Sequence, residues 1–277
     1  MNSKLALISI FLLQSLPAIA QEEHDWQSWP LVDHFTVSLN ALFPTLDTRV
    51  RLDASDGSPG TTIIFEQNLG MSDTETLPAL EFSWRFAKKH TLGLSTLRLD
   101  RSGSAITTSE IRIGDEVFTV DLPISSFIDM TLIGIEYSYS LVIDERKELA
   151  LGIGLSIQDI SFGLIGNLNA GIVEVGSDVT APVPTFLIKG GYAFTDKWLG
   201  KIGVGFLSFD LALDGDNRLG GDVFNGYVGI QHNTFERVHF GLSYQLFDIQ
   251  VDWNENGLNS AVKYEYQGPV LSVTAAF

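Results

Sequence analysis

The sequence predicts an all-β chain folded as a closed, antiparallel, up-and-down barrel of about ten strands, with twelve or eight strands as alternatives. Three observations predict this fold. Along the 277 residues, large apolar side chains alternate with small or charged ones at a period of two, which indicates strands. The connections between these segments switch regularly between tight and long. The last segment ends the chain on an aromatic residue, Phe277.

Composition excludes several classes of protein. The chain has 34 acidic and 17 basic residues, a formal charge of −17, and 45% apolar residues, which is too hydrophobic for a disordered acidic chain. Its acidity argues against nucleic acid as a partner, because phosphates require Lys and Arg. With no cysteine, the chain has no disulfide, no thiolate metal site and no cysteine nucleophile.

The first twenty residues resemble a cleaved export sequence. Lys4 precedes an apolar run over residues 5–13, and an A-x-A cleavage pattern ends at Ala20. The run is too short to cross a bilayer, which requires roughly 20 residues. We therefore expect a signal peptide at residues 1–20, a short periplasmic tail at 21–33 and one barrel domain at 34–277.

Ten segments carry the alternation. In residues 132–143, Ile133, Ile135 and Tyr137 share one face, while Gly134 and Glu136 lie on the other. A soluble sandwich would alternate as well, but a large, aromatic apolar face suits lipid, and a face of small residues suits a narrow interior. The ten predicted strands are residues 35–52, 77–86, 91–101, 127–143, 148–162, 183–194, 199–213, 223–234, 239–253 and 261–277.

The predicted connections alternate in length. Tight turns are expected at 87–90, 144–147, 195–198 and 235–238, long loops at 53–76, 102–126 and 163–182, and moderate loops at 214–222 and 254–260. Short periplasmic turns, longer external loops and an even strand count are typical of barrels that span the bacterial outer membrane.

The last strand carries a resemblance to a known class. Its sequence, Gly-Pro-Val-Leu-Ser-Val-Thr-Ala-Ala-Phe, has Leu271, Val273 and Ala275 on one face and ends at Phe277. Together with the signal peptide and the alternating strands, it resembles the Gram-negative outer-membrane β-barrel proteins. The resemblance implies an outer-membrane location, and it implies that these four residues are read by the barrel-assembly machinery.

Several places depart from the simple alternation of ten strands and their connections. Pro44 interrupts the first strand, because proline cannot donate a ladder hydrogen bond. Residues 61–65 could pair with residues 48–52 as an external hairpin or as wall, and residues 111–120 resemble another external hairpin. The apolar parity flips near Phe206 and near residues 245–247, which either bulges or strands rising beyond the bilayer would explain.

Charged residues on the face opposite the apolar one are expected to line the lumen. A buried charge must be paired or hydrated. The interpretations are an ion network that plugs a narrow barrel or a small channel that prefers anions. The predicted lumen residues are Arg49, Arg51, Glu81, Arg85, Glu136, Lys189, Lys201 and Glu265, with Gln158 and Gln245 beside them.

No catalytic or metal site is predicted. All five histidines (His24, His34, His90, His232 and His239) fall on the periplasmic side, whereas the enzymes of this barrel class resemble one another in using a histidine near the outer leaflet. Residues 214–222 begin like a calcium loop, but Arg218 and Leu219 occupy positions that need an oxygen ligand and a glycine.

We therefore expect a non-enzymatic outer-membrane barrel without a cofactor, with a plugged lumen and acidic external loops, in a structural or surface-interaction role. The alternatives are a narrow anion-preferring pore and a barrel enzyme that hydrolyses lipid or peptide. The expected partners are outer-membrane lipid, lipopolysaccharide, the assembly machinery and any extracellular ligand of the external loops.

Overall fold

A computed structural model describes residues 29–168, 171–212, 217–255 and 258–277. The predicted signal peptide, His24, most of the predicted tail and residues 214–216 of the calcium-like loop lie outside these ranges.

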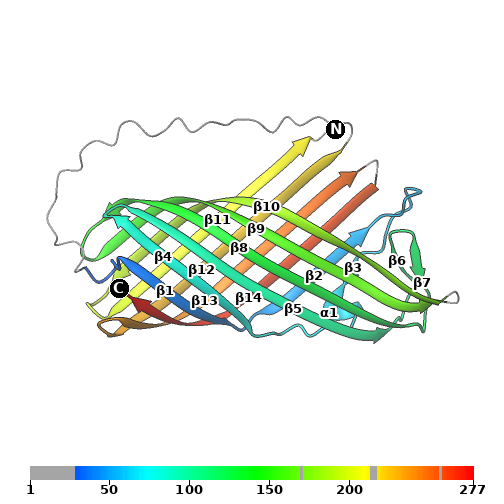
Figure 1. Cartoon of the computed structure of the whole chain (residues 1–277), viewed down its shortest axis with the longest axis horizontal. Helices are drawn as coiled ribbons and strands as arrows, with labels where there is room; N and C mark the ends of the chain where they lie inside the picture. The colour runs from blue at the N-terminus through cyan, green and yellow to red at the C-terminus, as the bar shows by residue number, and fades with distance from the viewer. Residues whose placement is uncertain (1–28, 169–170, 213–216, 256–257) are drawn as a thin grey trace.

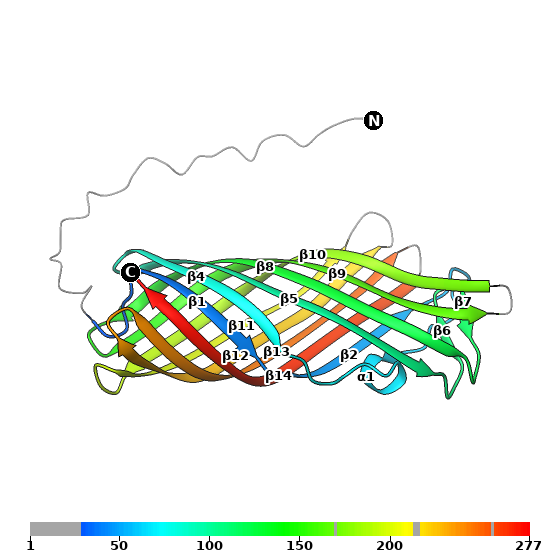
Figure 2. The same cartoon turned by 60° about the horizontal axis from the view of Figure 1, so that its bottom comes forward.

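Ten strands form a closed antiparallel ring (Figures 1 and 2). Each strand pairs with the next in the chain, and β1 closes the ring by pairing with β14. The ring consists of β1 (Phe35–Leu42), β4 (Leu77–Ala87), β5 (His90–Ile106), β8 (Pro123–Ile143), β9 (Lys147–Leu168), β10 (Gly171–Ala193), β11 (Trp198–Ala212), β12 (Arg218–Phe235), β13 (Val238–Glu255) and β14 (Leu258–Ala276). The predicted fold class is confirmed, and the sandwich alternative is wrong.

The predicted first strand is divided at Pro44 into β1 and β2 (Thr45–Leu52). Both pieces pair with β14 in one register, Leu42 opposite Val270 and Thr45 opposite Gln267. Only glycine fits at position 268 of β14, because a Cβ there would lie 2.4 Å from the Phe43 carbonyl oxygen. Beyond the break, the other edge of β2 pairs with the short β3 (Ile63–Ile64), so the predicted pairing of 61–65 with 48–52 is present in part.

The barrel has two halves of opposite polarity. Near the tight turns, β8 exposes Ile133 and Ile135 on its outer face, while near the other end Ile128 and Met130 are buried inside and Asp129 lies outside. The outward apolar residues of β8 span nine positions, 133 to 141. At ~3.3 Å per residue and a tilt of ~40°, they cover about 23 Å, close to the height of a bilayer-spanning apolar band. We call this part the membrane half and the remainder the external half.

The parity flips in the sequence mark the boundary between the halves. The registers of β11 with β12, β12 with β13 and β13 with β14 run without a shift through Phe206 and through residues 245–247, so no bulge is involved. The strands simply continue beyond the apolar band. The predicted loops at 163–182 and 254–260 are therefore wrong in large part, because β9 with β10 and β13 with β14 extend through most of them.

In the external half, the ring parts between β10 and β11. These strands pair only from Phe186 opposite Phe206 down to Ala193 opposite Leu199, although β10 begins at Gly171. Pro182 and Pro184 lie in β10 just beyond the last pair with β11, and neither has an N–H with which to continue the ladder. The outer ends of β10 and β11 lie far apart in both views (Figures 1 and 2).

On another side, the outer part of β5 is separated from β2 by the segment 65–76. This segment contains α1 (Phe65–Asn68), a single helical turn whose Phe65 is fully buried. It lies directly against β5, because a Cβ on Gly103 would be 2.7 Å from the Leu69 carbonyl oxygen. The segment therefore completes the wall where strand pairing does not.

Candidate functional site

The lumen of the membrane half holds a cavity of about 550 Å³. Small residues of the inner face, such as Gly154 and Gly203, leave this space between the strands. Its polar lining includes five predicted lumen residues: Glu81, Arg85, Glu136, Lys189 and Lys201.

Two ion pairs and one charged hydrogen bond lie in the cavity. The Lys189 ammonium forms an ion pair with the Glu136 carboxylate. The Arg85 guanidinium donates to both carboxylate oxygens of Glu148, at 2.8 and 3.0 Å. The Lys201 ammonium donates to the Gln231 side-chain oxygen at 2.7 Å. These contacts link β10 with β8, β4 with β9, and β11 with β12.

Glu148 was not singled out from the sequence. It stands two residues before Ala150 on the inward parity of β9, and that parity could have identified it.

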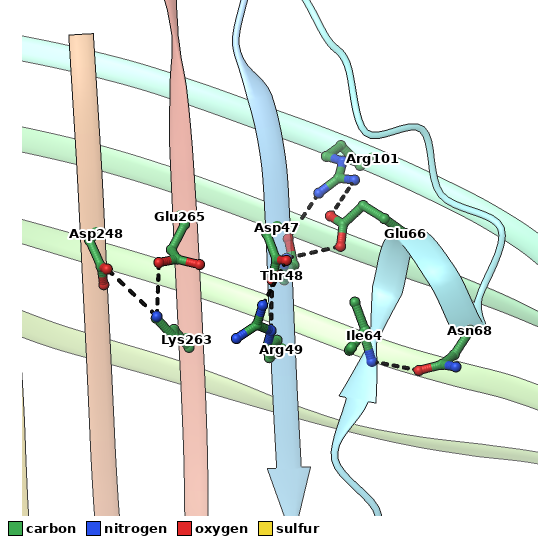
Figure 3. Close-up of polar contacts among 10 residues, drawn as sticks. All are labelled: Asp47, Thr48, Arg49, Ile64, Glu66, Asn68, Arg101, Asp248, Lys263 and Glu265. Atoms are coloured by element: carbon green, nitrogen blue, oxygen red, sulfur yellow. Dashed lines mark hydrogen bonds and ion pairs between the residues drawn. The ribbon is translucent and has the colours of Figure 1, made fainter.

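Three predicted lumen residues point outward instead. Arg49, Arg51 and Glu265 were placed by counting from an apolar face assumed to contact lipid, but they belong to the external half, where the apolar face is the inner one. Their neighbours Thr48, Val50 and Tyr264 are buried inside. On the outer wall, Arg49 pairs with Asp47 at 2.9 Å and Glu265 with Lys263 at 2.8 Å (Figure 3). Arg51 pairs with Asp53 at 2.9 Å.

Above the cavity, the external half is filled by apolar side chains. A continuous buried cluster includes residues of nine of the ten ring strands and of the external segments, among them Phe65, Leu99, Ile128, Phe162, Phe247 and Tyr264. The hairpin of β6 (Ile111–Ile113) and β7 (Glu116–Phe118) contributes Ile113 and Phe118, both fully buried. The predicted hairpin at 111–120 is thus present, and its apolar side chains join the buried cluster of the external half.

One buried ion pair joins the segment 65–76 to the strands of the external half (Figure 3). Arg101 of β5 donates to Glu66 of α1 at 2.8 Å and to the Thr48 hydroxyl of β2 at 3.0 Å, and it also contacts the Ser72 carbonyl oxygen. The second Glu66 carboxylate oxygen accepts the Thr48 backbone N–H at 2.9 Å. The side chains of Arg101 and Glu66 are only 1% and 8% exposed. We call these four residues the clasp; it joins β2, α1 and β5 where their strands do not pair.

Arg101 was not predicted as a site residue. Arg101 alternates in phase with the buried Leu97 and Leu99 of β5, so the strand pattern would place its side chain inside the barrel. Its partner Glu66 lies in the segment 65–76, whose path through the structure cannot be derived from strand alternation.

At the periplasmic mouth, residues 29–34 cross beneath the cavity. Leu31 and Asp33 contribute to the cavity lining, and a Cβ on Gly191 would lie 3.0 Å from a Leu31 methyl carbon. The Lys88 ammonium lies 4.9 Å from the centre of the Trp29 ring, and His239 lies 3.5 Å from the Asp33 carboxylate. Residues 29–34 therefore lie against the periplasmic side of the cavity.

The described histidines lie away from the external mouth of the barrel. His34, His90, His232 and His239 all lie at the end of the barrel that carries the tight turns, so among the described residues no imidazole reaches the external mouth. Within the same residues, no group of three or more His, Asp or Glu side chains is arranged to hold a metal ion. In the described ranges, no helix has the length and apolar character needed to cross a bilayer.

Comparison with solved structures identifies the class of fold. The chain is similar to the outer membrane protease OmpT from Escherichia coli, with a TM-score of 0.57 and 10% sequence identity over 88% of this chain and 96% of that one. Weaker likenesses include the Pseudomonas putida toluene transporter TodX (TM-score 0.39, 9% identity, 89% and 91% covered) and Neisserial surface protein A (TM-score 0.32, 11% identity, 88% and 97% covered).

The closed ring, the apolar band and the likeness to OmpT define a β-barrel of the Gram-negative outer-membrane type. No family model matches the chain, and no curated protein is similar to it in sequence. With identities near 10%, the likeness extends to the fold and not to an activity.

Proposed function

We propose that this chain is a non-enzymatic, non-conducting outer-membrane barrel that presents its external half to partners at the cell surface. The observation that carries the proposal is the buried apolar cluster that fills the external half, fastened by the clasp. Ions cannot cross such a layer without the cost of leaving water, which is several kcal/mol per charge.

The external half has the distribution of polarity that is typical of a water-soluble protein. Its interior is apolar and its outer wall carries charged groups, including Arg98, Asp100, Asp129, Asp159 and Asp178. Strand β9 continues for ten residues from Asp159 to its end at Leu168, which at ~3.3 Å per residue and ~40° of tilt is a rise of about 25 Å. A pore has to cross only the bilayer, and strands that end at its surface would be long enough. Strands that rise this far beyond the apolar band suit a protein that contacts partners outside the lipopolysaccharide layer.

The test is single-channel conductance of the refolded mature protein in a planar bilayer. A silent bilayer, with folding confirmed by resistance to detergent before boiling, supports the proposal. Discrete current steps with anion preference would contradict it and would favour a narrow pore lined by Lys189 and Lys201.

A matched pair of variants sharpens the measurement. Glu66→Ala removes one member of the clasp and should allow occasional openings, whereas Glu265→Ala removes a carboxylate of the outer wall and should leave the bilayer silent. Equal behaviour of these two variants would contradict the role assigned to the clasp.

A further inference from the structure

The parting between β10 and β11 leaves two strand edges without a partner. The even-numbered residues of β10 direct their backbone toward β11, since the Phe194 N–H donates to Trp198, while the Ala193 N–H donates to Arg146 on the β9 side. From position 172 to position 180, these even-numbered residues are all exposed. No strand in the described part of the chain pairs with this edge.

Strand pairing is blocked only at the end of this edge that is nearest the membrane half. Pro182 and Pro184 lack an N–H, which prevents β11 from continuing along β10. Beyond them, the segment from 172 to 180 contains no proline and keeps its donors and acceptors. An exposed edge of this length is a template for an added strand from another chain.

The side chains on each side of this edge define what an added strand must carry. On the outer face, the edge presents the exposed carboxylates Glu174 and Asp178. On the inner face, Val175 and Ala181 pack against the apolar cluster. Across the parting, β11 repeats the arrangement, with Asp210 exposed outside and Phe209 inside.

We propose that the β10 edge binds an extended peptide of a partner protein in which basic residues alternate with apolar ones. Such a strand would hydrogen-bond to the backbone of residues 172–180, place its Lys or Arg beside Glu174 and Asp178, and place its apolar residues over Val175 and Ala181. A second copy of the same edge is a poorer occupant, because pairing β10 with itself would bring four of these carboxylates together.

This inference rests on the proposed surface role, since it names the partner that the external half would meet. The probe is a fluorescent nine-residue peptide of alternating Lys and Val, measured by anisotropy against the full mature chain in nanodiscs, with empty nanodiscs as the blank. A peptide of the same sequence, N-methylated at alternate residues, lacks the ladder donors.

Two variants test the edge and one controls for charge. Glu174→Lys with Asp178→Lys should weaken binding about tenfold or more. Ile172→Pro with Thr180→Pro removes two edge donors at positions that do not serve the β9 ladder, and should weaken binding similarly. The matched control, Asp100→Lys with Asp129→Lys, changes the same charge on the paired strands β5 and β8, and should change binding by less than about threefold.

The outcomes separate this inference from the proposed function. Loss of binding with the edge variants and with the N-methylated peptide, but not with the control, supports it. Equal loss with both charge reversals, unchanged binding by the proline variant, or no binding by the unmodified chain would each overturn it. A silent bilayer in the conductance experiment would still stand in any of these cases.

Discussion

Removing the carboxylate of Glu66 should be among the most costly single changes in the external half. The Glu66→Ala variant would leave the Arg101 guanidinium inside the barrel with its side chain 1% exposed and without its counter-charge. Breaking a buried ion pair by removing one partner typically costs about 3–5 kcal/mol. The Thr48 backbone N–H, which donates to Glu66 at 2.9 Å, would also lose its acceptor.

The exposed pair on the same wall provides the control. Arg49 and Asp47 also lie 2.9 Å apart on β2, but their side chains are 40% and 33% exposed. Exposed pairs contribute roughly 0–1 kcal/mol, so Arg49→Ala should change stability little.

The assay is urea unfolding of each variant in lipid vesicles, compared by the change in free energy of unfolding at a common slope. A double variant, Arg101→Met with Glu66→Leu, should recover most of the lost stability, because an apolar pair needs no counter-charge. Changes in the free energy of unfolding that differ by less than about 1 kcal/mol between Glu66→Ala and Arg49→Ala would contradict a stabilising role of the buried pair.

Three further predictions concern the periplasmic end. Deletion of Phe277, whose backbone N–H donates to Phe35 at 2.9 Å across the barrel seam, should lower outer-membrane levels in cells; normal levels would refute an assembly role. In the 144–147 turn, the backbone N–H of Arg146 lowers the pKa of Asp144 below 3.8, so the turn should be retained at neutral pH and lost only as pH falls through that lowered pKa. Amide exchange of Arg146 measured against pH checks this, and protection lost near pH 6 would contradict it. Leu31→Ser should speed maleimide labelling of a Cys introduced at position 243 in the cavity lining, and an unchanged rate would show that residues 29–34 do not limit access.

Sequence patterns were sufficient for the membrane half and not for the external half. The strand pattern rests on large side chains facing lipid, and Ile133 to Leu141 meets that condition throughout. Above the apolar band, the outer face of β10 carries Glu174, Gly176 and Asp178, which resemble a loop although the backbone is a strand. The same reversal of polarity explains why Arg49, Arg51 and Glu265 were placed on the wrong face.

The clasp illustrates a second limit. Parity from Leu97 and Leu99 places Arg101 inside the barrel, so a counter-charge somewhere in the interior could have been expected. Its partner comes from α1, 35 residues earlier in the chain, in a connection that lacks strand alternation. Such a contact depends on the three-dimensional course of the connection, which a local pattern does not contain.

The same strands form a lipid-facing barrel at one end and a water-facing barrel with an apolar interior at the other. Because the chain has no cysteine, single cysteines at Ile153 and Asp159 of β9, two outward positions six residues apart, can carry a fluorophore without background. Quenching by bromine placed along the lipid chains measures whether each position lies in the bilayer. We expect strong quenching at position 153 and little at position 159. Equal, strong quenching at both positions would show that the bilayer covers the external half, and would contradict a water-facing outer wall there.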